Sequence, residues 1–333
     1  MADKKNNVAL LVGGTSPERE VSKNTGKSVL SALRELGYNV KIIDPAYGLN
    51  QPNDESKYFE EKDFSEINNK NYIEAINSTL FDEIDIAFIA LHGKWGEDGT
   101  VQSLLELRNI KYTGSNVLSS ALAMDKSMTK IMFQHFDVAT PRWFIVNKNE
   151  VDYELIQSKI KKFFGYPCVI KPNDEGSTIG LTICRGDIEV QDAVKKAIQF
   201  SSKALVEEYI SGHELTVAIL NQHALPVLEI KPKSGFYDYK NKYTSGKTDY
   251  IVPAEIPQKV SEHLQHQALL AFNSIGCKCY SRIDFRMTED FSTYCLEVNT
   301  LPGMTSTSLV PKMAKAAGIS FEELIDRIIK SSL

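Results

Sequence analysis

Hydrophobic residues recur along the chain with two different periods, which predict both strands and helices. Near the N-terminus the apolar runs Val8–Val12, Asn39–Asp44 and Ile84–Leu91 are typical of strands. The amphipathic stretch from Pro17 to Leu36 is typical of a helix. A strand, a glycine turn, a helix and a second strand indicate an open α/β domain, which we expect over residues 1–114.

Short strands separated by brief turns become more frequent after residue 114. Such neighbours favour an antiparallel sheet with helices on one face, so we expect residues 115–206 to form a second, α+β domain. The predicted elements are helices at Val117–Met124, Lys126–Phe136, Glu154–Phe164 and Ile188–Phe200, and strands at Arg142–Val146, Cys168–Lys171, Leu181–Cys184 and Ala204–Tyr209.

Residues 207–333 are expected to form a third domain, also α+β. Its first hairpin pairs Leu215–Leu220 with Ala224–Ile230, and a polar, aromatic segment from Lys231 to Tyr250 follows. Loops of this length are usually lids or disordered, and we expect a lid. A helix from Pro257 to Ile275, a second hairpin and two short helices complete the chain.

The second hairpin carries the most informative pattern. Its strands alternate, with Ile283, Phe285, Leu296 and Val298 on one face and Arg282, Asp284, Glu297 and Asn299 on the other. A turn centred on Asp290 and Phe291 places Asp284 opposite Glu297, and Arg282 opposite Asn299. Facing carboxylates repel, which suggests a cation between them, and oxygen ligands suit Mg²⁺. A solvated hairpin with a simple Arg–Asp ion pair is the alternative.

Cationic and glycine-rich segments suggest a phosphate site. Lys171 ends an apolar strand, and the loop Asn173–Gly180 that follows can offer backbone N–H groups to phosphate oxygens. A hairpin turn with an exposed lysine explains this segment equally well. Lys126 begins a helix, where a cation opposes the helix dipole unless an anion binds nearby. Glu207 and Glu208 end a strand, where they could hold an adenine edge or simply mark a charged edge strand.

Two further residues admit both a structural and a binding role. Glu18 follows Thr15 at the spacing of a capping box, but it also lies at the mouth of a Gly-Gly turn and could receive an ammonium group. His92 follows a buried strand, which is where open α/β sheets place ligands, although a lone histidine is often structural. The glycine fingerprint of nicotinamide dehydrogenases is absent.

Composition narrows the classes of partner and compartment. The formal net charge of −5 argues against broad attraction to nucleic acid or to an anionic membrane. The five cysteines are odd in number and lie mostly in apolar runs, which fits free thiols in a reducing cytosol. No run approaches the ~18 apolar residues of a membrane span. We therefore expect a cytoplasmic protein.

Taken together and in order, nine segments resemble the D-alanine–D-alanine ligases of the ATP-grasp superfamily over essentially the whole chain. They are Gly13–Ser22, Leu91–Gly93 with Gly96–Gly99, Met124–Lys126, Ile170–Pro172, Glu175–Ser177, Gly212–Thr216, Phe236–Tyr243, Arg282–Asp284 and Leu296–Thr305. The resemblance implies an ATP-grasp fold, in which an N-terminal open α/β domain precedes two α+β domains that clamp ATP.

The resemblance also implies a role for each candidate residue. ATP would contact Lys126 and Lys171 through its phosphates, Glu207, Glu208, Tyr209 and Ile210 through adenine, and Glu214 through ribose. Two Mg²⁺ ions, for which Mn²⁺ is a substitute, would bind Asp284, Glu297 and Asn299. The amino acids and the transferred groups would contact Glu18, His92, Ser177, Lys242, Tyr243, Arg282, Gly303, Ser308 and Leu309.

The implied reaction is ATP-dependent ligation of two D-alanine molecules through an acyl phosphate, for bacterial peptidoglycan synthesis. The resemblance further implies a homodimer. A ligase of the same fold that takes D-lactate or D-serine is an alternative, although Tyr243 argues against D-lactate because depsipeptide-forming relatives tend to lack that tyrosine. A non-catalytic nucleotide-binding module is a third hypothesis, and the set of metal ligands argues against it.

Overall fold

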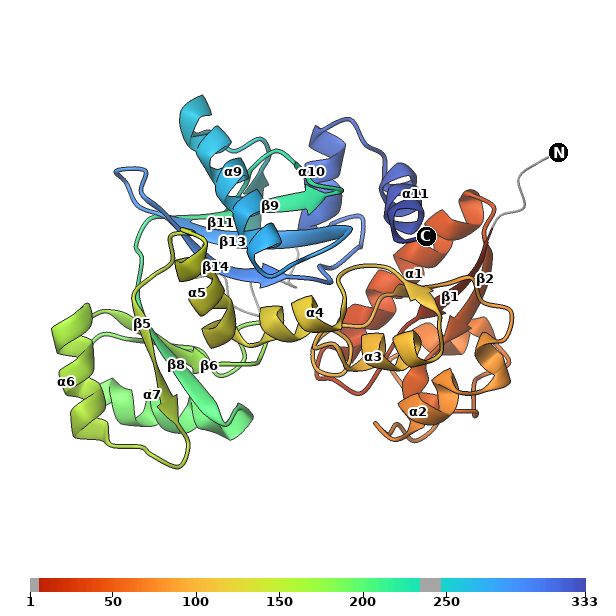
Figure 1. Cartoon of the computed structure of the whole chain (residues 1–333), viewed down its shortest axis with the longest axis horizontal. Helices are drawn as coiled ribbons and strands as arrows, with labels where there is room; N and C mark the ends of the chain where they lie inside the picture. Colours follow the sequence, from red (N-terminus) through yellow and green to blue (C-terminus); the bar gives the residue numbers. More distant parts are fainter. Residues whose placement is uncertain (1–5, 234–246) are drawn as a thin grey trace.

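The computed structural model describes residues 6–233 and 247–333, and its strands form three sheets (Figure 1). The N-terminal sheet lies at the right of this view and the middle sheet at the lower left. The C-terminal sheet lies above and between them. The chain therefore has the α/β and α+β composition that the hydrophobic pattern predicts.

The N-terminal sheet is parallel, with strand order β2-β1-β3-β4. Apart from Asn7, its central strands β1 and β3 consist of apolar residues that are buried on both faces, as is typical of parallel sheets. The strands are β1 (Asn7–Leu11), β2 (Asn39–Ile43), β3 (Ile86–Ile89) and β4 (Lys111–Tyr112); the helices are α1 (Arg19–Glu35), α2 (Asn71–Ile76) and α3 (Thr100–Leu107), with short 3₁₀ turns η1 (Pro45–Tyr47), η2 (Glu55–Phe59) and η3 (Thr79–Phe81).

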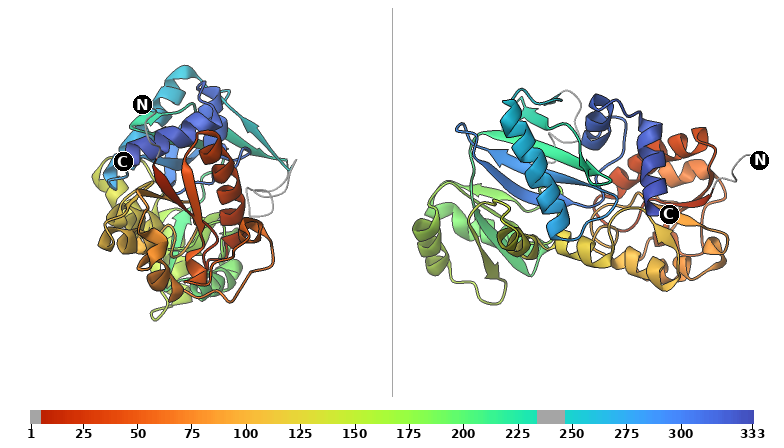
Figure 2. Two further views of the ribbon diagram at one scale, coloured as in Figure 1. Left: turned by 90° about the vertical axis from the view of Figure 1, so that its right-hand side faces the viewer. Right: turned by 45° about the horizontal axis from the view of Figure 1, so that its top comes forward.

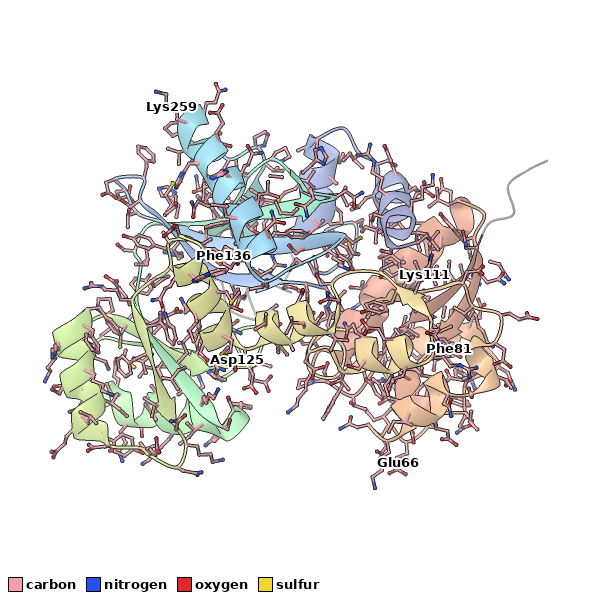
Figure 3. The ribbon with its side chains drawn as sticks, in the orientation of Figure 1. Glu66, Phe81, Lys111, Asp125, Phe136 and Lys259 are labelled. Carbon is pink, nitrogen blue, oxygen red and sulfur yellow. The ribbon has the colours of Figure 1, made fainter. Side chains whose placement is uncertain are left out.

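Helices α4 (Val117–Met124) and α5 (Lys126–His135) lead to the middle sheet. Asp125 marks the junction between them, and α5 runs from there towards Phe136 (Figure 3). The sheet is antiparallel, as predicted, and shares a core with helices α6 and α7. Its order is β5-β8-β6-β7, from β5 (Trp143–Asn147), β6 (Cys168–Pro172), β7 (Thr182–Cys184) and β8 (Lys203–Glu208), with α6 (Tyr153–Phe163) and α7 (Asp187–Phe200).

The C-terminal sheet is also antiparallel, and α9 packs on it. Its order is β12-β11-β9-β13-β14, with β10 paired to β9. The elements are β9 (His213–Leu220), β10 (His223–Ala224), β11 (Leu228–Pro232), β12 (Thr248–Ile251), α9 (Gln258–Ser274), β13 (Tyr280–Met287), β14 (Thr293–Asn299), α10 (Leu309–Ala316) and α11 (Phe321–Ser332).

The last two helices return to the N-terminal part of the chain. Figure 2 shows α11 beside α1, and Ile325 and Ile328 share one buried cluster with Val29 and Leu33. The C-terminal segment therefore completes the N-terminal core. The domain limits drawn after residues 114 and 206 stay a prediction.

The hairpin β13–β14 has the predicted register. Asp284 pairs with Glu297, and Arg282 with Asn299. The predicted position of Leu296 is wrong, because a bulge after Asp284 brings Phe285 opposite Cys295. Cys295 is therefore buried in the core, and Leu296 lines a cleft instead.

None of the helices in residues 6–233 and 247–333 is long and apolar enough to cross a membrane.

A glycine at the turn between β8 and β9 allows the chain to pass close to β13. Gly212 has a φ of 111°, and a Cβ at this position would overlap the carbonyl oxygen of Met287. Arg286 fastens the same turn, because its Nε donates to the Ile210 carbonyl at 3.0 Å and its Nη2 to the Gly212 carbonyl at 2.8 Å.

We predict that Gly212→Ala lowers the free energy of unfolding by about 2 kcal/mol or more, since overlap adds to left-handed strain. Urea unfolding of both proteins measures the change. Gly186→Ala is the matched control, because its Cβ would meet nothing within 4 Å. Equal stability of the two variants would contradict this account of the turn.

Candidate active site

A cleft opens between the middle and C-terminal sheets, with about 1070 Å³ of space including its open side. Many predicted site residues line the cleft together: Lys126, Lys171, Ser177, Glu207, Glu208, Tyr209, Ile210, Glu214, Arg282, Asp284, Glu297 and Leu309. Apolar side chains that sequence reasoning did not select complete the wall, namely Val169, Leu181, Ile183, Ile230 and Leu296.

Of the predicted metal ligands, Asp284 and Glu297 line this cleft from adjacent strands, and Asn299 ends β14 two residues after Glu297. Asp284 and Glu297 face each other across β13 and β14. Arg282 forms a bidentate ion pair with Asp284, at 2.8 and 2.7 Å, so the ion pair that the sequence left open is present. Thr216 also donates to Asp284 Oδ1, at 2.7 Å.

The donor set of this hairpin fits Mg²⁺. Asn299 Oδ1 is buried and accepts no hydrogen bond from the described residues, so a ligating oxygen is available beside the two carboxylates. The part of the chain that the structure describes holds no cluster of three His, Cys, Asp or Glu side chains with metal-site geometry. Two carboxylates and an amide oxygen are instead the set that a Mg²⁺ ion uses when phosphates supply further ligands.

Two lysines approach the same carboxylate from the middle part of the chain. Lys126 Nζ lies 3.5 Å from Glu297 Oε2 and donates to the Glu175 carbonyl at 2.7 Å. Burial disfavours the charge of Lys171, but Glu207 and Glu297 outweigh it and raise the pKa of Lys171. The cleft therefore presents cations beside the candidate metal ligands, which is an arrangement suited to a polyphosphate.

The paired glutamates at the end of β8 point to different partners. Glu207 is buried, with Lys171 Nζ 2.5 Å from Oε1 and Lys130 Nζ 2.9 Å from Oε2. Glu208 instead forms a bidentate pair with Arg142, at 2.9 and 2.8 Å. The carboxylate of Glu207 is therefore the one buried at the cleft, and that of Glu208 is held at the surface.

A second group of predicted residues lies beyond the cleft, around Glu18. Ser177 Oγ donates to Glu18 Oε1, which joins the glycine loop to the start of α1. A Cβ on Gly93 would be 2.8 Å from Glu18 Oε2, and a Cβ on Gly176 would be 3.2 Å from it. Small residues therefore leave room around this carboxylate.

The capping-box interpretation of Thr15 and Glu18 is wrong. Helix α1 begins at Arg19, and Glu18 itself occupies the cap position without a side-chain cap bond. Thr15 Oγ1 donates to Asn69 rather than to the helix. The Glu18 carboxylate is consequently available to face Ser177.

His92 holds this region together through both ring nitrogens. Nδ1 lies 3.1 Å from Glu97 Oε1, and Nε2 lies 3.0 Å from Thr25 Oγ1. Burial raises the pKa of Glu97, the hydrogen bond from His92 opposes this, and the nearby charge of Glu18 adds to the rise. Thr25 also borders Gly303, so His92 belongs to one connected polar region.

Ser308 and Leu309 lie at the start of α10, and Gly303 lies in the loop before it. A Cβ on Gly303 would be 3.2 Å from Ser308 Oγ, and that hydroxyl accepts from the Thr305 N–H at 3.0 Å. Leu309 is the first residue of α10 and lines the cleft. Lys242, which the resemblance assigned to the transferred phosphoryl group, and Tyr243, which it assigned to closure of the site, lie outside the described residues.

An ion-pair network behind Glu18 was missed by sequence reasoning. Arg19 Nη2 lies 2.6 Å from Asp44 Oδ2, and Arg19 Nε lies 2.7 Å from Asp63 Oδ1. Asp44 Oδ1 also accepts from the Gly14 N–H at 3.0 Å. The network fixes the glycine turn that carries Glu18, and only the apolar strand before Asp44 hinted at it.

The family comparisons cover both halves of the chain. The family model described as D-ala D-ala ligase N-terminus matches residues 7–115, and that described as D-ala D-ala ligase C-terminus matches residues 132–330. The chain belongs to the D-alanine–D-alanine ligase family.

Individual members of this family are similar over nearly the full length. The D-alanine–D-alanine ligase of Syntrophotalea carbinolica is 42% identical over 97% of this chain and 94% of its own. The crystal structure of the Bacillus anthracis ligase complexed with ATP matches with a TM-score of 0.78 and 32% identity, covering 99% of this chain and 97% of its own.

A ligase that is named for D-serine has the same fold. The VanG D-Ala:D-Ser ligase of Enterococcus faecalis matches with a TM-score of 0.82 and 28% identity, covering 99% of this chain and all (100%) of its own. The fold of this chain is the ATP-grasp fold of these ligases, as the resemblance implied.

We predict that Thr216→Val weakens Mn²⁺ binding in the presence of ADP by about 10-fold, because Asp284 loses the hydroxyl that orients it. Electron paramagnetic resonance titration measures free Mn²⁺ directly. Thr216→Ser keeps the hydroxyl and should bind as the unaltered protein does. Unchanged affinity in Thr216→Val would mean that Thr216 does not orient a metal ligand.

Proposed function

We propose that this chain joins two D-alanine molecules into D-alanyl-D-alanine and converts ATP to ADP and phosphate. The observation that carries the proposal is the contact between Ser177 and Glu18. This contact joins two regions. One is the cleft, with its lysines and the oxygen ligands that suit Mg²⁺, and the other surrounds the Glu18 carboxylate, which suits the ammonium group of an amino acid. Membership of the ligase family supports the same reaction.

ATP would occupy the cleft between the two antiparallel sheets. Lys126 and Lys171 would bind its phosphates, and Glu207 with the backbone of Tyr209 and Ile210 would bind adenine. Glu208 would contribute backbone at this edge, since its carboxylate pairs with Arg142, and Glu214 would bind the ribose. The Bacillus anthracis relative, whose structure contains ATP, supports a nucleotide in this fold.

Asp284, Glu297 and Asn299 would hold Mg²⁺, which neutralises phosphate charge during transfer when it is bound. We propose two ions, for which Mn²⁺ can substitute. Arg282 is bonded to Asp284, so its guanidinium lies within the same site. From there it would share with the Gly303 N–H the stabilisation of the oxyanion that forms during amine attack.

The amino acids would bind around the start of α1 and the start of α10. Glu18 would receive the ammonium group of the first D-alanine, with Ser177 and His92 beside it. Ser308 and the Leu309 N–H would bind the carboxylate of the second, because a helix N-terminus favours anions. Lys242 and Tyr243, which lie outside the described residues, keep their implied roles at the transferred phosphoryl group and the closed site.

Attack by the second amine requires an activated carboxyl group. ATP would phosphorylate the carboxylate of the first D-alanine to an acyl phosphate, with ADP as the other product. The amine of the second D-alanine would then attack the acyl carbon, lose a proton and release phosphate as the leaving group. Because open water would hydrolyse an acyl phosphate, the reacting groups need a cover. The lid expected at Lys231–Tyr250, of which residues 234–246 lie outside the described residues, would supply it, with the Ser177 loop closing against it. We propose the cytoplasm as the compartment, a homodimer as the assembly and peptidoglycan precursors as the use of the product.

We predict that the purified protein releases ADP from ATP only when D-alanine is present, and that D-alanyl-D-alanine forms in equal amount. Mass spectrometry of the dipeptide and an ADP assay measure the two products. Competing D-serine and D-lactate test the alternative that the VanG neighbour suggests. ATP binding without D-alanine-dependent turnover would favour a non-catalytic nucleotide-binding module.

We predict that Glu18→Gln raises the KM for D-alanine by about 10- to 100-fold, because a charge-assisted hydrogen bond to an ammonium group contributes about 1.5–3 kcal/mol. The KM for ATP should stay within about 3-fold of its value in the unaltered protein. That change is much smaller than the one expected from losing a hydrogen bond of this strength. Steady-state kinetics with each substrate varied in turn separates the two constants. A rise confined to the KM for ATP would place Glu18 at the nucleotide instead.

A further inference from the structure

Lys130 is a fully buried lysine at the edge of the proposed adenine site. It lies on α5, which runs between Asp125 and Phe136 in Figure 3. Its side chain is 0% exposed, and its Nζ lies 2.9 Å from Glu207 Oε2 and 2.6 Å from Thr140 Oγ1. A buried ammonium group is unfavourable unless it is paired, so its position calls for a physical reason.

Lys130 is one of two cations on a single carboxylate. Lys171 Nζ contacts the other oxygen of Glu207 at 2.5 Å. Burial opposes ionisation of Glu207, but the charges of Lys130 and Lys171 outweigh it and lower the pKa of Glu207 to about 2. Burial lowers the pKa of Lys130, and the charge of Glu207 opposes that effect, so Lys130 depends on this carboxylate for its own charge.

Glu207 retains capacity to accept a hydrogen bond. Its Oε2 is buried and, within the described residues, accepts no hydrogen bond of good geometry, although Lys130 lies close enough for an ion pair. Glu207 also lines the cleft. An anionic acceptor held in this way recognises an N–H donor of a ligand and rejects a carbonyl oxygen.

Lys130 also connects this acceptor to the strand that carries the candidate metal ligands. Thr140 Oγ1, which receives the Lys130 ammonium, donates to the Cys295 carbonyl at 2.8 Å. The Cys295 N–H donates in turn to the Ala139 carbonyl at 2.7 Å. Cys295 lies two positions before Glu297 on β14, so one lysine spans both walls of the cleft.

We propose that Lys130 is a positioning residue that fixes and neutralises the Glu207 carboxylate, so that Glu207 accepts the exocyclic amino group of adenine while Lys171 keeps its charge for the phosphates. The inference rests on the proposed use of ATP. Without Lys130, Glu207 and Lys171 form a closed neutral pair. The preference of Glu207 for adenine and the attraction of Lys171 for the ATP phosphates should then weaken together.

A comparison of ATP with ITP tests the inference, because ITP carries a carbonyl oxygen where ATP carries the amino group. Lys130→Met keeps the length of the side chain and removes its charge. We predict that the ratio of kcat/KM for ATP to that for ITP falls by about 10-fold or more, as for one charged hydrogen bond. The change should arise mainly from a higher KM for ATP, with little change in the KM for D-alanine.

Glu207→Gln and the double variant show whether Lys130 acts through Glu207. If it does, Lys130→Met/Glu207→Gln should select between ATP and ITP no worse than Glu207→Gln does. Additive losses would overturn the proposal, and so would an unchanged ratio in Lys130→Met. Lys23→Met is the matched control, since Lys23 is 2% exposed and ion-paired on α1, and its ratio should not change.

Two measurements keep the test decisive if a variant folds poorly or turnover is absent. Thr140→Val leaves Lys130 in place but removes its second contact, and it should shift the ratio in the same direction, whereas Thr140→Ser should not. Isothermal titration calorimetry with ADP and with IDP measures the affinity for each nucleotide, so it compares adenine with hypoxanthine without requiring turnover. A protein that prefers ADP through Lys130 but forms no dipeptide would contradict the proposed function and retain this inference.

Discussion

The repulsion between Asp284 and Glu297 is the constraint on which the organisation of the cleft depends. The two carboxylates occupy directly opposed positions on β13 and β14, where like charges destabilise a sheet. Cationic groups from three separate segments surround them: Arg282 on β13, Lys126 on α5 and Lys171 on β6. A site that concentrates opposite charges in this way is arranged for a ligand that brings both cations and anions, as a metal nucleotide does.

The repulsion between Asp284 and Glu297 also explains why the cleft lies between two sheets, because the cations that balance these carboxylates come from both sides. Arg282 can reach Asp284 along its own strand, but Lys126 and Lys171 come from the middle part of the chain. Lys130 and Thr140 extend this connection to the backbone of β14. Electrostatic contacts therefore hold together two sheets whose apolar cores are separate clusters.

Local patterns predicted those parts of the site that depend on strand alternation and turn position. The pairing of Asp284 with Glu297 followed from the lengths of two strands and the turn between them. The bulge that moves Leu296 into the cleft could not be predicted, because an added residue in one strand leaves no periodic signal. The capping-box prediction failed because α1 begins one residue after Glu18, whose carboxylate instead contacts Ser177, a residue distant in sequence.

Long-range contacts account for most of what the sequence did not reveal. Lys130 follows Lys126 by one helical turn and resembles an ordinary helix lysine until Glu207 and Thr140 are placed beside it. Arg286 has the alternation of a solvated strand residue, but it holds the carbonyls of Ile210 and Gly212. Arg19 looks like one more charge at a helix start, although Asp44 and Asp63 bury it.

The packing of α10 and α11 holds two parts of the proposed amino-acid site together: the loop with Gly303 and Ser308, and the start of α1 with Glu18. These helices share a core with α1 and β3, so the loop with Gly303 and Ser308 is fixed relative to Glu18. The Ser177 loop belongs to the middle sheet and reaches Glu18 through the Ser177 hydroxyl. One side of the amino-acid pocket therefore has a shared hydrophobic core, and the other side includes a polar contact between a loop and the start of a helix. A ligase that must admit substrates and then exclude water needs this asymmetry.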